Sequence, residues 1–231
     1  MEREHRFVYT GGPPPTRPWY KFWPPGLPKQ LDYPRCPTFN IIEESAKRFP
    51  DKVAVNFYGR EITYRELYDS SINLAGYLSK LVKTGSRVAV CIGNAPHWHI
   101  CAFGVHRANA VLTSVNPLLS ADEIEYVLRD SGAEVLICLS DRVDEMLSIL
   151  GRTSVRHVIC GHWRDYLPAE PQPEPPEGIL TAAPVSRRDV VSWLDVVSQR
   201  QEPPEPALGV SDPALIIYTS GTTGVPKGVV H

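Results

Sequence analysis

Groups suited to binding an anion are concentrated near the end of the chain. The run is Tyr218-Thr219-Ser220-Gly221-Thr222-Thr223-Gly224-Val225-Pro226-Lys227-Gly228. Glycine lets backbone N–H groups turn toward a ligand, and successive N–H groups form a concave anion site. Hydroxyl groups add donors, and a lysine ammonium group adds a positive charge that suits phosphate. The run therefore predicts a loop that holds a triphosphate, with a flexible polar turn as the alternative.

The surroundings of the lysine separate this loop from the Walker phosphate loop. A Walker loop needs Gly-Lys-Ser/Thr leading into a helix, whose N-terminus helps to hold the anion. Here Lys227 follows Pro226 and precedes Gly228, and the continuation Gly-Val-Val-His is typical of a strand. The preceding run, Ala-Leu-Ile-Ile-Tyr at 214–218, predicts a buried strand. We therefore expect an exposed loop that joins two strands, which disfavours an NTPase of the Walker type.

The loop needs a scaffold, and the chain before it alternates between strand and helix patterns. Apolar runs predict strands at 52–58, 61–63, 87–92, 110–115, 134–139 and 155–160, and helical spacing predicts helices at 39–49, 64–85, 96–109, 121–130 and 141–150. Two capping boxes mark helix starts, Thr63 with Glu66 and Ser120 with Glu123. Strands separated by helices pair in parallel, and continuous apolar strands fit a sheet covered on both faces. The expected fold is an α/β, doubly wound, mostly parallel sheet with helices on both faces.

Proline and acidic residues divide the chain. Residues 1–36 predict a proline-rich extended arm, because proline fixes a backbone torsion and removes an N–H donor. We expect the aromatic residues of this arm to pin it to the domain, with a partner-binding proline motif as the alternative: Trp19, Tyr20, Phe22 and Trp23. Residues 37–231 form the main domain, with acidic proline-rich loops at about 165–186 and 201–213. A helix is expected between these loops, at 186–200, with its apolar residues inward: Val190, Val191, Leu194 and Val197.

Bulk properties exclude several classes of protein. The formal net charge is -2, which does not favour nucleic acid as a partner. The five cysteines are an odd number and form no CxxC pair, which is typical of a reducing compartment. The first residues lack the apolar core of a signal peptide, and no run of about 18 apolar residues occurs. We therefore expect no membrane span and a cytoplasmic location.

Three histidines and a cysteine are crowded on the helix expected at 96–109: His97, His99, Cys101 and His106. His99 and His106 share a helix face, but their spacing of seven residues is too long for two ligands of one metal ion. Packed or solvated histidines are therefore expected, and no residue is assigned as a metal ligand.

The loop resembles a known signature. Tyr-Thr-Ser-Gly-Thr-Thr-Gly-Val-Pro-Lys-Gly is similar to the signature loop of the adenylate-forming (AMP-dependent synthetase/ligase) superfamily, which includes acyl-CoA synthetases, coumarate ligases, luciferases and peptide-synthetase adenylation domains. Residues 50–78 and 85–138 resemble N-terminal segments of the same superfamily. Together with the arm, they look most like the long-chain fatty-acid–CoA ligase branch. The resemblance extends from about Pro24 to His231.

This resemblance implies a two-step reaction. A small-molecule carboxylate attacks the α-phosphate of ATP to give an acyl-adenylate and pyrophosphate, and the thiol of coenzyme A then displaces AMP. The resemblance gives Lys227 a catalytic role. It also assigns ATP binding to the loop residues, some through side chains and others through backbone shape: Thr219, Ser220, Gly221, Thr222, Thr223, Gly224 and Lys227. Magnesium is expected as well, although the glutamate that usually holds it lies beyond this sequence.

Two departures from the superfamily pattern stand out. Relatives usually have glycine at the position of Asn109, which should need a left-handed backbone; asparagine is the next most suitable residue. The sequence also lacks the later Gly-Tyr-Gly-x-Thr-Glu segment, the ribose-binding aspartate and the C-terminal catalytic lysine. We therefore expect a truncated, N-terminal fragment of the AMP-binding domain that is inactive alone. The alternative is a non-catalytic phosphate-binding module completed by a separate polypeptide. The acyl chain length and the oligomeric state stay open.

Overall fold

A computed structural model describes residues 17–29, 31, 33–183, 185, 187–219 and 224–231. The chain divides into two compact units, one up to Cys36 and one from Pro37 to His231. Within the described residues, no helix is both long enough and apolar enough to cross a membrane.

The smaller unit contains a short 3-10 helix, η1 (Pro18–Phe22). The prediction of a wholly extended arm is therefore wrong for these residues. Pro18 stands at the start of η1, where its fixed backbone torsion suits a helical turn and its missing N–H costs nothing. The ring of Tyr20 packs edge-on against Trp19 and Trp23. That these rings pin the arm to the larger unit stays a prediction.

A seven-stranded sheet forms the centre of the larger unit. Its strand order is β7-β6-β5-β3-β4-β8-β9, and every neighbouring pair is parallel except β8 with β9. The strands are β3 (Arg87–Cys91), β4 (Val111–Ser114), β5 (Val135–Leu139), β6 (His157–Gly161), β7 (Val191–Ser192), β8 (Leu215–Thr219) and β9 (Lys227–Val230). This arrangement confirms the expected mostly parallel α/β sheet.

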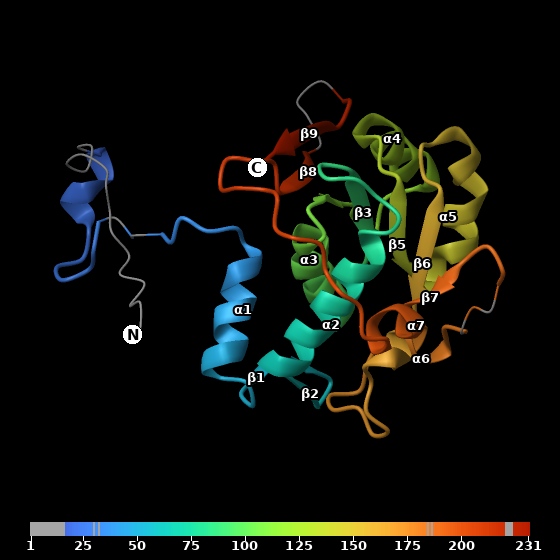
Figure 1. The fold of residues 1–231 in the computed structure, drawn as a ribbon, viewed down its shortest axis with the longest axis horizontal. Coiled ribbons are helices and arrows are strands. Elements are labelled where there is room, and N and C mark those ends of the chain that lie inside the picture. Colours follow the sequence, from blue (N-terminus) through green and yellow to red (C-terminus); the bar gives the residue numbers. More distant parts are fainter. Residues whose placement is uncertain (1–16, 30, 32, 184, 186, 220–223) are drawn as a thin grey trace. The chain divides into compact units, whose positions relative to one another are not determined.

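Helices cover both faces of the sheet (Figure 1). Alternate strand residues such as Val88 and Val90 share one apolar cluster with α2 (Tyr64–Leu78), α3 (Pro96–Arg107) and α7 (Trp193–Ser198), against which α1 (Phe39–Arg48) also packs. The residues between them, such as Ala89, join a second cluster with α4 (Ala121–Ser131) and α5 (Val143–Ile149). Successive side chains of a strand point to opposite faces, so near-continuous apolar strands fill both clusters.

Both predicted capping boxes are present. Thr63 caps the start of α2, and Ser120 caps the start of α4. Each hydroxyl accepts a hydrogen bond from the backbone N–H of the glutamate three residues later, and the carboxylate of that glutamate accepts one from the backbone N–H of the capping residue. α2 is shorter than expected, because it ends at Leu78 rather than near Gly85. Before α2, the antiparallel strands β1 (Val53–Phe57) and β2 (Arg60–Thr63) form a separate hairpin.

The prediction of a helix at 186–200 is wrong in its extent. Its first residue, Ser186, lies outside the described residues. Val191 and Ser192 instead extend the sheet as β7 beside β6, and the helix α7 starts only at Trp193. Trp193 and Val197 are buried, whereas Leu194 is exposed. Pairing with the edge of the sheet satisfies backbone groups that the first helical turn would leave free, so the sheet edge overrides the helical pattern.

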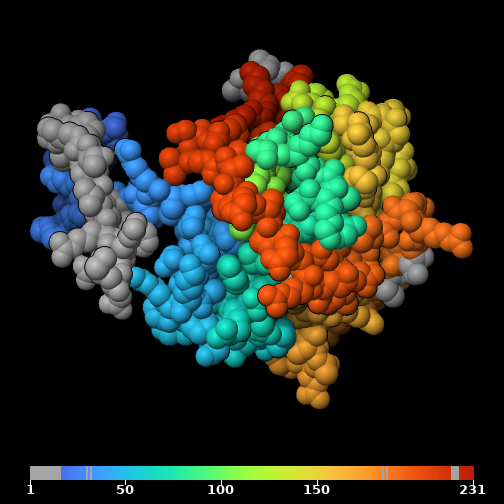
Figure 2. All heavy atoms as spheres, in the orientation of Figure 1, coloured from blue at the N-terminus to red at the C-terminus, as the bar shows by residue number. Residues whose placement is uncertain are grey.

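Short elements interrupt the remaining segments. They are the 3-10 helices η2 (Ser140–Arg142), η3 (Leu150–Arg152) and η4 (Trp163–Asp165), and the helix α6 (Glu177–Thr181), which lies in the first acidic loop. The second acidic loop runs irregularly from residue 199 to β8, yet it is fastened to the domain. Lys80 of the α2–β3 connection binds the Gln201 side chain, and Asn73 of α2 bonds with the backbone at both Val197 and Gln201. Figure 2 shows this segment, in orange-red, lying over the surface beside the green-blue atoms of α2.

Candidate functional site

The predicted phosphate loop connects two antiparallel strands. Thr219, the last residue of β8, pairs with Lys227, the first residue of β9, and Tyr218 pairs with Gly228. No helix starts at Gly224, so the expected distinction from the Walker loop holds. Gly224 has a backbone φ of +88°, a conformation that favours glycine, and the space around it is open. Ser220, Gly221, Thr222 and Thr223 lie outside the described residues.

The strand before the loop is less buried than expected. The strand predicted at 214–218 is present as β8 (Leu215–Thr219), but the prediction that it is buried is wrong, because its residues are half-buried or exposed and Ile217 is 39% exposed. Every residue of β9 is exposed. β9 ends the sheet, and β8 lies at the border of the two apolar clusters, where Leu215 touches one and Tyr218 the other.

Lys227 is the best-placed cation for a phosphate in the described part of the loop. Its side chain is exposed, and within the described residues no carboxylate lies at ion-pair distance from its ammonium group. Thr219 is exposed across the hairpin from it. The loop therefore begins at a hydroxyl, on Thr219, and ends at a positive charge, on Lys227, and both groups suit an anion.

A cleft of about 700 Å³ lies at the carboxyl ends of the central strands. Its lining comes from the segments that follow β3, β4 and β5, with Trp98 of α3 and Trp163 of η4. The chain leaves β3 toward β4 on one side and leaves β5 toward β6 on the other, so the cleft lies where the strand order reverses. Open parallel sheets bind ligands at this kind of position. Because β8 is parallel to β4, the phosphate loop follows β8 at the same edge of the sheet.

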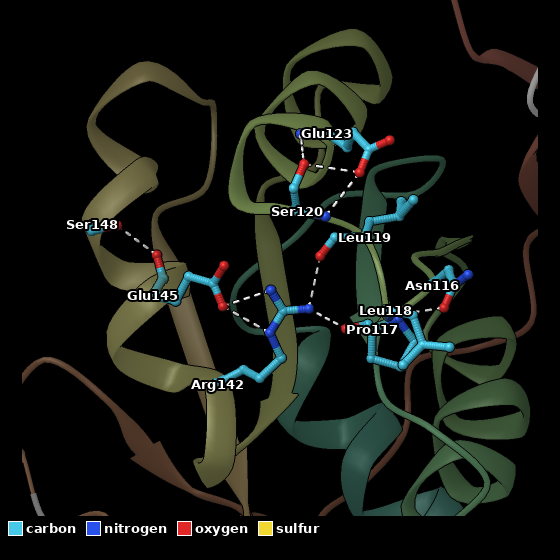
Figure 3. Close-up of polar contacts among 9 residues, drawn as sticks. All are labelled: Asn116, Pro117, Leu118, Leu119, Ser120, Glu123, Arg142, Glu145 and Ser148. Carbon is cyan, nitrogen blue, oxygen red and sulfur yellow. Dashed lines mark hydrogen bonds and ion pairs between the residues drawn. The ribbon is translucent and has the colours of Figure 1, made fainter.

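Arg142 holds two walls of this cleft together (Figure 3). Its Nη1 donates to the backbone carbonyls of Pro117 and Leu119, and its Nε donates to Oε2 of Glu145 at 2.8 Å. The segment after β4 is thus fastened to the segment after β5. Sequence patterns did not single out this cleft or Arg142; the loops that follow successive buried strands were the available signal.

The thiol of Cys91 lies in the cleft wall but is not a nucleophile at neutral pH. Burial raises its pKa to about 12, so the thiol stays protonated, and only the thiolate is strongly nucleophilic. The cleft is therefore suited to binding rather than to covalent chemistry through this residue.

Two of the three histidines of α3, His97 and His106, have structural hydrogen-bond partners. His97 is fully buried, and its Nε2 lies 3.0 Å from Oδ2 of Asp165. Nε2 of His106 lies 2.8 Å from the carbonyl oxygen of Ala214. Burial is the main cause that lowers the pKa of both imidazoles. Among the described residues, no group of three or more histidine, cysteine, aspartate or glutamate side chains has the arrangement of a metal site.

Comparison with known proteins places this fold and loop in context. Residues 42–231 match the family model described as "AMP-binding enzyme". Long-chain-fatty-acid–CoA ligases of Bacillus subtilis strain 168 and Yersinia pestis are 30% and 31% identical, over 93% and 92% of this chain but only 40% and 39% of their own length. The chain therefore spans about 40% of the length of these relatives.

Solved structures share the fold. The anthranilate CoA ligase AuaEII, in complex with anthranoyl-AMP, has a TM-score of 0.71 at 24% identity, over 85% of this chain and 35% of its own. A long-chain-fatty-acid-CoA ligase from Archaeoglobus fulgidus has a TM-score of 0.67 at 24% identity, over 87% of this chain and 37% of its own. With the family model matching most of its length, the chain belongs to the AMP-binding enzyme family.

Proposed function

We propose that this chain supplies the phosphate-binding part of an enzyme that activates a carboxylate with ATP and transfers the acyl group to coenzyme A. The supporting observation is the strand–loop–strand arrangement, with Lys227 exposed and unpaired among the described residues, in a chain that belongs to the AMP-binding enzyme family. Long-chain fatty acids are the proposed carboxylates, because two relatives at 30% and 31% identity are named long-chain-fatty-acid–CoA ligases. The proposed location is the cytoplasm.

The chemistry explains why a phosphate loop is needed. A carboxylate oxygen attacks the α-phosphorus of ATP, a new P–O bond forms, and pyrophosphate leaves with the electron pair of the bond that breaks. Negative charge then accumulates on the leaving pyrophosphate, and fixed donors and cations aimed at that charge lower the barrier. In the second step the thiol attacks the acyl carbon, loses its proton, and displaces AMP. Lys227 and the loop donors would act on the leaving pyrophosphate in the first step.

The loop is proposed to hold the β- and γ-phosphates through Thr219, Ser220, Thr222, Thr223 and Lys227, with Gly221 and Gly224 giving it its shape. Lys227 belongs to the strand β9, and the backbone of this strand is held by its pairing with β8. A cation fixed in this way needs less reordering when phosphate binds than a cation on a free tail.

Binding of tripolyphosphate to the 231-residue chain tests this function directly. Lys227→Ala should weaken the affinity about tenfold, because a charge-assisted hydrogen bond contributes roughly 1.5 kcal/mol or more. Lys83→Ala is the matched control, because Lys83 is also an exposed lysine but precedes β3, at the opposite edge of the sheet. Titration calorimetry at fixed ionic strength gives both affinities. Equal affinities for the wild type and Lys227→Ala would contradict the proposed role.

The alternative function is a non-catalytic phosphate-binding module that a separate polypeptide completes. It shares the loop chemistry and differs in whether the remaining catalytic segments belong to the same polypeptide as the loop. Reading the nucleotides that follow the His231 codon separates the two: a reading frame that continues into the remaining part of the relatives supports a single enzyme, and a stop codon at that point supports the module.

A further inference from the structure

The helix α4 forms hydrogen bonds with residues on both sides of the phosphate loop. The hydroxyl of Tyr126 donates to the backbone carbonyl oxygen of Pro226 at 3.1 Å. Pro226 directly precedes Lys227, so this bond holds the backbone at the point where the lysine enters β9.

A second bond from the same helix holds the other strand. The hydroxyl of Tyr218 donates to Oδ2 of Asp130 at 2.6 Å, and Tyr218 directly precedes Thr219 in β8. Burial, followed by this bond to the carboxylate, raises the pKa of the Tyr218 hydroxyl, so the hydroxyl stays protonated and remains a donor at neutral pH.

The ring of Tyr218 also lies against Gly228 of β9. A Cβ atom at position 228 would lie 3.1 Å from Cζ of Tyr218, which is tighter than ordinary van der Waals contact. The absence of a side chain at Gly228 therefore lets the tyrosine ring cross the hairpin. Through this ring, Asp130 is connected to both strands.

The helix that makes these contacts is itself well anchored. Tyr126 and Asp130 are four residues apart, so they share one face of α4. The opposite face buries Ile124 and Leu128 in the core, and the capping box at Ser120 fixes the start of the helix. Such a helix can position a loop, because its own geometry is set by the core and not by the loop.

We propose that α4 sets the position of the phosphate loop, with Tyr126 and Asp130 as positioning residues for phosphate binding. Tyr126 fixes the backbone next to Lys227, and Asp130 acts through Tyr218 on the backbone next to Thr219. Neither residue needs to touch the phosphate. The benefit is preorganisation, because a loop held in place before binding loses less conformational freedom when the anion arrives. This inference rests on the proposed phosphate-binding function.

Tyrosine-to-phenylalanine variants test the proposal, because each removes one hydroxyl and keeps the ring. Tyr126→Phe and Tyr218→Phe should each weaken tripolyphosphate affinity about fivefold, the effect of one net hydrogen bond. Tyr20→Phe is the matched control. It removes the same kind of bond, a tyrosine hydroxyl donating to a backbone carbonyl at 3.1 Å, from the other unit of the chain, where Lys29 is the acceptor. Its affinity should equal that of the wild type.

A double-mutant cycle separates positioning from general destabilisation. If Tyr126 acts through the placement of Lys227, Tyr126→Phe should cost little further affinity in the Lys227→Ala background. Amide hydrogen exchange gives a second readout: exchange at Gly224 and Val225 should speed up in Tyr126→Phe, while exchange in β5 should not change. Affinities are measured well below each variant's melting midpoint, so that lost stability does not imitate lost binding.

The outcomes are distinguishable. A normal Lys227→Ala affinity would reject the proposed function itself. A weakened Lys227→Ala affinity with normal Tyr126→Phe and Tyr218→Phe affinities would reject the positioning role alone. Additive losses in the double variant would also reject it, because they would show that Tyr126 acts independently of Lys227.

Discussion

Asn109 combines a left-handed backbone with a structural role for its side chain. Its backbone φ is +59°, as the expected left-handed position requires. Its side chain does what glycine cannot: Nδ2 donates to the carbonyl oxygen of Glu205 at 2.7 Å, and Oδ1 accepts from the N–H of Ala207 at 2.8 Å. Asparagine therefore ties the second acidic loop to the end of α3 at the amino-terminal edge of the sheet.

The effect of replacing Asn109 separates its two roles. Asn109→Gly keeps the left-handed backbone but loses both hydrogen bonds, so we expect about 1–2 kcal/mol less stability. Asn109→Ala should cost more, because it loses the bonds and also strains the backbone. Urea unfolding of both variants and the wild type checks the order. Equal stability of Asn109→Gly and the wild type would mean that the two bonds contribute nothing net.

At the scale of elements, the close approach of α2 and α3 depends on a glycine inside a helix. A Cβ atom at Gly104 would lie 2.9 Å from Cδ2 of Leu74 and 3.0 Å from the carbonyl oxygen of Ser71. Leu74 is fully buried, so its side chain has no free space into which it can move. The backbone carbonyl cannot move without distorting α2.

Gly104→Ala should therefore reverse the usual effect of this substitution. In an open helix, glycine to alanine stabilises by about 1 kcal/mol. Here we expect a loss of roughly 1–3 kcal/mol, as for overpacked cores. Gly178→Ala is the matched control, because Gly178 lies in α6 with no atom near the added Cβ. Urea unfolding should show opposite signs for the two variants, and a stabilising Gly104→Ala would contradict the packing argument.

At the scale of the whole molecule, one edge of the central sheet carries both the cleft and the predicted phosphate loop. The cleft after β3, β4 and β5 and the loop after β8 both lie at the carboxyl ends of parallel strands. Beside the cleft, Arg142 forms an ion pair with Glu145 three residues along the chain. The chain spans about 40% of the length of relatives that are named as CoA ligases. We therefore propose that the other groups needed for the reaction belong to a longer assembly.

We expect the 231-residue chain alone to make no acyl-CoA. Catalytic groups act together, so a partial set loses far more rate than its share of residues. AMP release from ATP with magnesium, coenzyme A and a panel of fatty acids should not exceed that of Lys227→Ala. In an assembly that includes the remaining part of the relatives, Lys227→Ala should slow pyrophosphate exchange more than it weakens acyl binding. Turnover by the chain alone, lost in Lys227→Ala, would overturn this expectation.

The sequence alone determined the elements whose signals are local. The capping boxes at Ser120 and Thr63 formed as expected, because each depends on two residues three positions apart. The parallel strands were predictable from apolar runs separated by helices. The continuation Gly-Val-Val-His after Lys227 favoured a strand instead of a helix, and β9 confirms that prediction. These features depend on neighbouring residues, which a sequence shows directly.

The tertiary structure decided the features that depend on distant partners. Val191 belongs to the sheet because β6 offers an open edge for pairing. The burial of β8 depends on which helices cover this strand. The hydrogen bonds from Tyr126 to Pro226 and from Tyr218 to Asp130 join residues about a hundred positions apart. The cleft likewise exists only because the strand order reverses at β3 and β5. Local propensity carries no information about which strand lies beside which, and the order of the strands fixes which edge of the sheet carries the loop and the cleft.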